Sequence, residues 1–254
     1  MDIDKVAQAL AAAERILIIT GAGLSADSGL PTYRGLGGLY NGETEDGLPI
    51  EVALSGPTLR SDPALCWKYL AEIGRVCLKA EPNAGHFAIA ELQRRKPGAW
   101  VLTQNIDGFH GRAGSPVERL IEIHGQLAPL SCVGCGETDS RPLPALLDGA
   151  LPPRCAHCAA VLRPAVVLFE EMLPDAALAD LHEQSRIGFD AVLVVGTSAS
   201  FGYILEPVWR VRHRGGFVAE VNLQATDISP FTDVRLEGRA ADVLSQLIRH
   251  ISSD

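Results

Sequence analysis

Four apolar runs of strand length constrain the fold of this chain more than any other feature. They are ERILIIT (14–20), AWVLTQ (99–104), DAVLVVGTS (190–198) and GFVAEVN (216–222). Near-continuous apolar strands are typical of a parallel sheet that helices cover on both faces. Residues 62–80, between the runs, have the apolar spacing of such a helix. The sequence therefore predicts a doubly wound, Rossmann-like α/β fold.

Two further runs extend this alternation. ERLIEIHG (118–125) and RPAVVLF (163–169) have the length of strands, and we assign both to the same parallel sheet. Asn83 is a predicted N-cap for the helix AGHFAIAELQRR, because asparagine is favoured at that position.

Length and composition indicate one large domain that carries a smaller one. A chain of 254 residues with 47% apolar content can bury a large core. We predict that residues 1–35, 80–125 and 163–254 form the large dinucleotide-binding domain. Residues 36–79 are predicted to be a helical lid segment over the ligand, and residues 126–162 a zinc-ribbon insertion.

The insertion contains two tight cysteine pairs. Cys132-x-x-Cys135 and Cys155-x-x-Cys158 are separated by 19 residues, a spacing typical of two knuckles that close one tetrahedral zinc site. Four thiolates fill the coordination sphere, so the predicted metal is structural and not catalytic. His157 is interpreted as a neighbour of the site and not as a ligand.

The glycine-rich segment GAGLSADSGLPTYRG (21–35) directly follows the first predicted strand. Gly21-x-Gly23-x-x-Ala26 matches a dinucleotide-binding pattern, in which glycines let backbone N–H groups approach phosphate. The motif alone fits a tight strand-to-helix turn equally well. Arg34, further along the segment, has a guanidinium that could hold a diphosphate.

Other predicted strands also end in polar or small residues, at TQNID (103–107), GTS (196–198) and EVN (220–222). Each of these residues alone is an ordinary turn former. Ligands bind outside the carboxyl ends of strands in open α/β sheets, so several such ends together indicate one ligand site.

His124 closes the run LIEIH just before the first cysteine pair. A lone histidine is more often structural than catalytic. The place of His124 between the predicted sheet and the insertion, where a cleft is expected, makes it the candidate catalytic residue.

The charge of the chain limits its partners. A net charge of −9 and a pI near 5.3 argue against a broad nucleic-acid-binding surface. No apolar stretch reaches the roughly 20 residues that span a bilayer, and the acidic start MDID is unlike a signal peptide. We expect a cytoplasmic protein that binds neither nucleic acid nor membrane.

Taken together, the motifs carry a resemblance that covers nearly the whole chain. GAGLSADSGLPTYRG, TQNID, EIHG, the two CxxC pairs, VVLFEEMLP, GTS and EVN resemble, in order and spacing, the sirtuin family of NAD-dependent protein deacylases. The resemblance implies that NAD is consumed as a co-substrate and that zinc is structural. It also implies that acylated-lysine proteins are the substrates and that nicotinamide and 2′-O-acyl-ADP-ribose are released.

The resemblance also implies roles for individual residues. His124 would be the general base that takes a proton from a ribose hydroxyl, since its ordinary pKa lies near neutral pH. Asn105 and Asp107 would hold the nicotinamide end, and Gln104 the adjoining ribose. The full set implied for NAD binding is Gly21, Ala22, Gly23, Ala26, Thr32, Tyr33, Arg34, Gln104, Asn105, Ile106, Asp107, Gly196, Thr197, Ser198, Asn222 and Ala240.

The implied substrate-binding residues are Leu70, Ile73, Val167, Phe169 and Glu170. The acylated peptide would add as a strand beside residues 167–171 and the loop after Ser198. Leu70 and Ile73 stand where relatives specialised for acidic acyl groups carry Tyr-x-x-Arg, which favours neutral acyl chains here.

Two other positions depart from the usual family pattern. Tyr33 replaces phenylalanine beside the arginine, and Glu170 replaces glycine between Phe169 and Glu171. Two alternatives stay open, and these departures favour the first of them. One is a mono-ADP-ribosyltransferase or NAD hydrolase, and the other is a non-enzymatic, zinc-bearing NAD sensor. The presence of His124 argues against the sensor, because binding alone needs no base.

Overall fold

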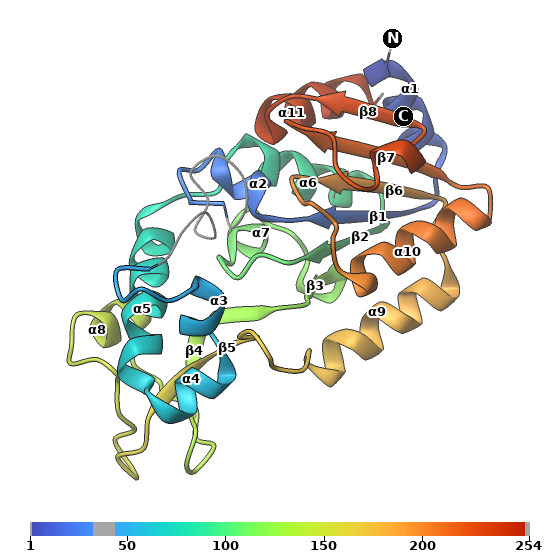
Figure 1. The fold of residues 1–254 in the computed structure, drawn as a ribbon. Coiled ribbons are helices and arrows are strands. Elements are labelled where there is room, and N and C mark those ends of the chain that lie inside the picture. Colours follow the sequence, from blue (N-terminus) through green and yellow to red (C-terminus); the bar gives the residue numbers. More distant parts are fainter. Residues whose placement is uncertain (1, 33–43, 252–254) are drawn as a thin grey trace.

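A six-stranded parallel sheet is the centre of the molecule (Figure 1), for which the computed structural model describes residues 2–32 and 44–251. The strands lie in the order β3-β2-β1-β6-β7-β8, and every neighbouring pair is parallel. Their bounds are β1 Arg15–Thr20, β2 Gly98–Thr103, β3 Leu120–Glu122, β6 Ala191–Val195, β7 Phe217–Asn222 and β8 Val234–Glu237. The strand order reverses between β1 and β6, which makes a topological switch point there. The predicted α/β class is confirmed.

Helices cover both faces of this sheet. Helices α1 (Asp2–Ala12), α6 (Ala84–Arg95) and α11 (Ala240–His250) pack on one face, and α9 (Asp175–Ile187) and α10 (Gly202–His213) on the other (Figure 1). On β1, Ile16 and Ile18 join the first layer, whereas Leu17 and Ile19 join the second. Continuous apolar strands are needed because each face of the sheet is buried.

The predicted cap of α6 is confirmed. The Asn83 side-chain oxygen accepts from the backbone N–H of Gly85 at 2.9 Å, and His86 completes a reciprocal capping box.

A smaller domain lies to one side of the sheet. Strands β4 (Gly125–Cys132) and β5 (Leu162–Val166) form an antiparallel pair. The helices packed around this pair are α3 Ile50–Ala53, α4 Gly56–Ser61, α5 Pro63–Lys79 and α8 Leu143–Leu147. One apolar core joins these helices to both strands. The helices before residue 80 and the cysteine insertion therefore share a core.

The assignment of residues 163–169 to the parallel sheet was wrong. Within this run, β5 ends at Val166 and pairs only with β4 among the described strands. Along β5, Leu162, Pro164 and Val166 are buried and Ala165 is exposed, which suits a strand with a single core face. Pro164 has no N–H to donate to a central ladder. The pairing of β5 with β4 also brings the two cysteine pairs together.

The remaining elements are short. They are α2 Ala22–Ala26, α7 Phe109–Arg112 and the 3₁₀ turns Val117–Arg119 and Ser229–Phe231. Of the run 118–125, only the three residues of β3 join the parallel sheet, since the chain before them is in a 3₁₀ turn and Gly125 already begins β4. Among the described residues, no helix combines the length and apolar character needed to cross a membrane.

Candidate functional site

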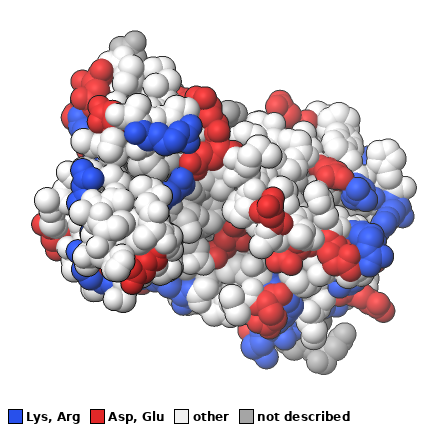
Figure 2. All heavy atoms as spheres, turned by 90° about the horizontal axis from the view of Figure 1, so that it is seen from below, with Lys and Arg blue, Asp and Glu red and all other residues white. Residues whose placement is uncertain are grey.

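A cavity of about 890 Å³ lies between the carboxyl ends of the sheet strands and the small domain. On the face seen in Figure 2, a hollow runs between the smaller and larger lobes, with acidic side chains beside it. Of the predicted site residues, those that line the cavity are Gly21, Ala22, Gly23, Ala26, Thr32, Leu70, Ile73, Gln104, Asn105, Ile106, His124, Val167, Phe169, Glu170, Gly196, Thr197, Ser198, Asn222 and Ala240. Tyr33 and Arg34 lie outside the described residues.

The glycines at the first strand end allow two backbone segments to touch. The N–H of Gly23 donates to the carbonyl of Gly196 at 2.8 Å. A Cβ on Gly23 would lie 2.8 Å from the backbone of Gly196, and one on Gly21 would lie 2.7 Å from the Thr197 side chain. Gly196 has a φ of +58°, which favours glycine. The loops after β1 and β6 therefore form a close-packed floor with no room for side chains.

Asn105 and Asp107 are tied to this floor through Ser25. The Asn105 amide donates to the Gly21 carbonyl and to Ser25 Oγ, both at 3.1 Å. Ser25 Oγ donates to Asp107 Oδ2 at 2.6 Å. Burial raises the pKa of the Asp107 carboxyl, although the Ser25 hydrogen bond opposes the shift. Asp107 lies behind Ser25 and does not line the cavity. Through its hydrogen bond with Ser25, Asp107 helps to hold Asn105, which does line the cavity.

Hydrogen bonds among Gln104, Thr197 and Asn222 connect the ends of three strands. Gln104 Nε2 donates to Thr197 Oγ1 at 2.8 Å, and Asn222 Nδ2 donates to the Thr197 carbonyl at 3.1 Å. Gln104 and Thr197 follow β2 and β6, and Asn222 is the last residue of β7. Together with the glycine floor they form what we call the nucleotide end of the cavity: Gly21, Gly23, Gln104, Asn105, Thr197 and Asn222.

His124 stands between the nucleotide end and the small domain. Its Nδ1–H donates to the Gln104 carbonyl at 2.9 Å, which leaves Nε2 as the acceptor nitrogen of a neutral ring. Tyr203 Oη lies 2.7 Å from Nε2. Burial lowers the pKa of His124, and the Gln104 hydrogen bond opposes this shift. The ring is therefore held in the form that accepts a proton.

The other part of the cavity, which we call the acyl end, consists of the apolar side chains of Leu70, Ile73, Val167 and Phe169 together with the carboxylate of Glu170. Leu70 and Ile73 come from α5. The hydroxyl of Tyr69, by contrast, donates to Asp46 at 2.5 Å, and Arg75 donates to the Leu147 carbonyl at 2.7 Å. Neither Tyr69 nor Arg75 lines the cavity.

Residues 167–171 are held by internal hydrogen bonds. The N–H groups of Val167 and Phe169 donate to the His124 and Leu54 carbonyls at 2.9 and 3.0 Å. The N–H of Leu168 donates to the Glu171 carboxylate at 3.0 Å, and the N–H of Glu171 donates to the Leu168 carbonyl at 3.1 Å. Within the described part of the chain, the N–H of Glu170 is the one on this segment without such a partner.

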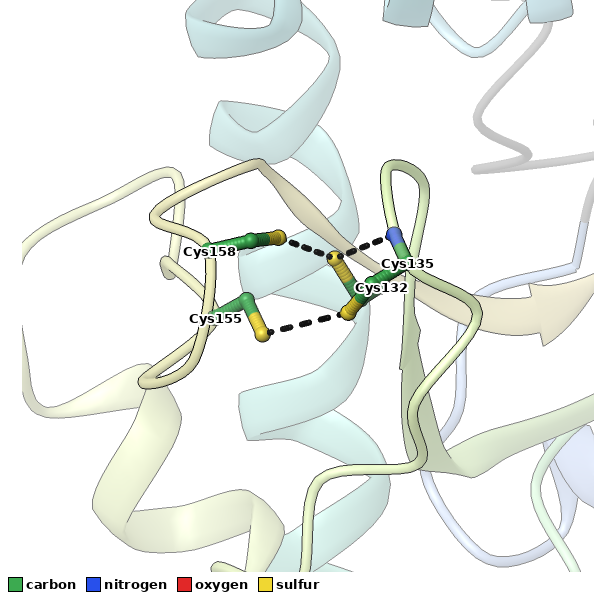
Figure 3. Close-up of side chains that lie close together, drawn as sticks. All are labelled: Cys132, Cys135, Cys155 and Cys158. Atoms are coloured by element: carbon green, nitrogen blue, oxygen red, sulfur yellow. Dashed lines mark hydrogen bonds between the residues drawn. The ribbon is translucent and has the colours of Figure 1, made fainter.

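The four predicted metal ligands converge in the small domain (Figure 3). The sulfur atoms of Cys132, Cys135, Cys155 and Cys158 all lie within 4.8 Å of one another. Tetrahedral Zn–S bonds of about 2.3 Å require sulfurs separated by roughly 3.8 Å. The backbone N–H groups of Gly134 and Cys135 donate to Cys132 Sγ at 3.3 and 3.5 Å, which favours a thiolate. The donor set fits a structural zinc ion.

Sequence reasoning missed several residues that line the cavity or support those that do. Ser25 has no signal of its own within the glycine-rich segment, although it bonds both Asn105 and Asp107. Tyr203 lies near the start of α10, and no motif of the sequence marks it. Arg239 forms an ion pair with Asp27 at 2.9 Å beside the predicted Ala240. Each of these residues is placed by contacts with segments that are distant in the chain, so local sequence patterns do not reveal it.

Comparison with known proteins agrees with the geometry. A sequence profile of the Sir2 family matches residues 21–201. The chain is similar to NAD-dependent protein deacylase 2 of Pseudomonas aeruginosa, with 69% identity over 249 residues, covering 98% of this chain and 97% of the relative. A mutant Sir2 homologue in complex with 2′-O-acetyl ADP ribose is 33% identical with a TM-score of 0.84, covering 97% of this chain and 95% of that one. A Sir2 complex with a p53 peptide and NAD+ is 26% identical with a TM-score of 0.84, covering 98% of each chain.

Proposed function

The chain belongs to the Sir2 family, and from this premise we propose that it is an NAD-dependent protein deacylase acting on acylated lysine. The observation that carries the proposal is the position of His124. A neutral, proton-accepting nitrogen lies on the wall of one cavity, between the nucleotide end, where backbone meets backbone, and the mainly apolar acyl end. This arrangement suits a base that acts where a nucleotide and an acyl group meet.

The nucleotide end fits NAD. The glycine floor brings backbone close to a ligand, and the amides of Gln104 and Asn222 lie at the carboxyl ends of β2 and β7, on the same edge of the sheet, where ribose hydroxyls would bind. When bound, NAD supplies an electrophilic ribose carbon with nicotinamide as the leaving group. We assign Asn105, held by Gly21 and Ser25, to the nicotinamide side.

His124 has the role of general base in this proposal. Its Nδ1–H is committed to the Gln104 carbonyl, so Nε2 takes the proton of a ribose hydroxyl. The Gln104 carbonyl then stabilises the imidazolium that forms. Because burial lowers the pKa of His124, the ring stays neutral at a lower pH than an exposed histidine would.

The acyl end supports a preference for neutral acyl groups. Leu70 and Ile73 offer apolar contacts, and the nearby Tyr69 and Arg75 are engaged with Asp46 and the Leu147 carbonyl. A distal carboxylate would enter this end without a cationic partner among the described residues. We therefore assign acetyl or longer aliphatic chains to this site.

The substrate is an acyl-lysine protein or peptide in this proposal. A peptide strand would pair with the loop after Ser198 and with the N–H of Glu170, which has no hydrogen-bond partner among the described residues. A cytoplasmic location stays a prediction. It is supported by six cysteines without a disulfide, which suit a reducing compartment.

The test is to incubate the purified protein with NAD and a panel of acyl-lysine peptides and to identify products by mass spectrometry. We expect deacylated peptide, nicotinamide and acyl-ADP-ribose in equal amounts, and no deacylation when NAD is omitted. ADP-ribosylated protein, or free ADP-ribose without deacylation, would favour the transferase or hydrolase. Absence of any NAD turnover would favour the sensor.

A further inference from the structure

The unprotonated nitrogen of His124 has two possible hydrogen-bond donors, the Tyr203 hydroxyl and a ribose hydroxyl. An unprotonated imidazole nitrogen accepts a single hydrogen bond in the ring plane. Nδ1–H already donates to the Gln104 carbonyl, so Nε2 is the nitrogen available to a ribose hydroxyl. In this structure the hydroxyl of Tyr203 lies 2.7 Å from that nitrogen. A phenol that donates to Nε2 and a ribose hydroxyl that donates to Nε2 exclude each other.

The position of Tyr203 is well defined by its neighbours. Its ring stacks on Phe201 at a centroid distance of 5.3 Å with an interplanar angle of 11°. His124 meets both rings edge to face, at 6.0 Å from Tyr203 and 6.2 Å from Phe201. Burial raises the pKa of Tyr203 to about 12, so the phenol keeps its proton and acts as the donor. The rings of Phe201, Tyr203 and His124 therefore form one small aromatic cluster that includes the base.

The segment that carries Tyr203 is also connected to the nucleotide end. Ala199, a buried residue, has a φ of +51°, a left-handed conformation that is strained for a non-glycine residue. Its N–H donates to Thr197 Oγ1 at 3.1 Å, and the same oxygen accepts from Gln104 Nε2. A ligand that contacts Thr197 therefore acts on the backbone leading to Tyr203.

We propose that Tyr203 is a cap on the catalytic base: its hydroxyl occupies His124 Nε2 in the ligand-free enzyme, and the ribose hydroxyl of NAD displaces it. The proposal rests on the proposed function for the identity of the displacing group. Tyr203 is a positioning residue here, since it acts through His124 and takes no part in the reaction. Binding of NAD and release of His124 Nε2 from the Tyr203 hydroxyl then occur in the same step.

The cap has a defined effect on the protonation of His124. A donor to Nε2 stabilises the neutral ring, so removing it raises the pKa of His124 in the free enzyme. The neighbouring titratable groups are Asp107 after β2, Glu122 on β3 and Glu170 and Glu171 after β5. None of these carboxylates is hydrogen-bonded to the His124 ring, whose partners in the described structure are the Gln104 carbonyl and the Tyr203 hydroxyl.

The experiment compares Tyr203→Phe with wild type. The variant keeps the ring and its stacking on Phe201 and loses only the hydroxyl. Tyr69→Phe is the matched control, because it removes a phenol hydroxyl that bonds Asp46 outside the cavity. The pKa of His124 is measured in the ligand-free proteins by magnetic resonance of isotope-labelled histidine, with the resonance assigned from His124→Ala.

We expect Tyr203→Phe to raise the pKa of His124 by about one pH unit, and Tyr69→Phe to leave it unchanged. The apparent pKa of the acid limb of kcat/KM for NAD should rise by the same amount, because kcat/KM reports the enzyme before NAD binds. The acid limb of kcat should stay in place. Well above both pKa values, kcat/KM for NAD should rise severalfold, because no phenol has to be displaced.

Two results would overturn the cap. An unchanged pKa of His124 in folded Tyr203→Phe would mean that the phenol does not occupy Nε2. A tenfold or larger loss of kcat, with both acid limbs moving, would mean that Tyr203 takes part in proton transfer. The titration needs no turnover. A protein that deacylates nothing would therefore refute the proposed function while the titration still decides the cap.

Discussion

The two ends of the cavity are built in different ways. The nucleotide end is made of strand ends of one sheet, where backbone meets backbone and the supporting side chains are buried in the two cores that sandwich the sheet. The acyl end is made of one face of α5 and a loop after β5, and its core includes the metal ligands Cys132 and Cys155. The nucleotide end therefore depends on the sheet, and the acyl end depends on the small domain.

Removal of the metal is the test of this difference with the largest expected effect. We expect Cys155→Ser to lose zinc, to lower the melting temperature by roughly 10 °C or more, and to leave less than about 1% of deacylation, because zinc thiolates provide folding energy to so small a unit. If the ends are separate, peptide binding should weaken much more than NAD binding. Calorimetry, metal analysis and titration with each ligand measure the three effects.

Cys77→Ser is the matched control, since Cys77 is a buried thiol of the same core outside the cluster. Metal analysis that finds no zinc in freshly purified wild type would refute the structural zinc. An equal loss of NAD and peptide binding in Cys155→Ser would show that the two ends are not independent.

The second test lies where the ends meet. His124→Ala should lower kcat by about 10² or more, the usual contribution of a positioned base, while NAD binding stays nearly intact. His182→Ala, on the exposed surface of α9, should match wild type. Because burial lowers the pKa of His124, wild-type kcat/KM should fall only below the pH at which an ordinary histidine protonates. Near-normal turnover of His124→Ala with saturating peptide would refute the assignment.

The difference between the ends also explains what the sequence could predict. The glycine floor was predictable because the backbone contact requires glycine at Gly21 and Gly23. The cysteine cluster was predictable because the spacing of zinc ligands is visible in the local sequence. The pairing of β5 with β4 was not, since an apolar run does not say which strand lies beside it. Ser25 and Tyr203 were missed because their partners, Asp107 and His124, are distant in the chain.

The third test concerns the acyl group. We expect acetyl and butyryl peptides to exceed the succinyl version of the same peptide in kcat/KM by about tenfold or more, because a carboxylate placed beside Leu70 and Ile73 loses hydration without gaining a partner. Each methylene against these side chains returns about 0.8 kcal/mol. Steady-state kinetics on the three peptides is the measurement. A preference for the succinyl peptide would refute the interpretation that the acyl end binds neutral acyl groups.

The smallest expected effect is at Glu170, on the rim of the acyl end. Its φ of +62° is a conformation that glycine adopts without cost, yet the chain carries a carboxylate there. Two other acids of the cavity are paired, Glu171 with Arg163 at 2.7 Å and Asp27 with Arg239 at 2.9 Å. No ion pair involves Glu170 among the described residues. Its charge is therefore available to a cationic residue flanking the acyl-lysine.

Two substitutions separate the charge of Glu170 from its backbone conformation. Glu170→Gln removes the charge and keeps the strain, whereas Glu170→Gly removes both. Wild type should prefer a peptide with arginine beside the acetyl-lysine over one with glutamate by roughly 2- to 5-fold at low salt, the range of an exposed ion pair. Both variants should lose this preference, and high salt should abolish it in wild type. Only Glu170→Gly should also raise stability, by about 1 kcal/mol, because the left-handed conformation then carries no penalty. A preference that survives in Glu170→Gln would assign the selectivity to the shape of the rim and not to its charge.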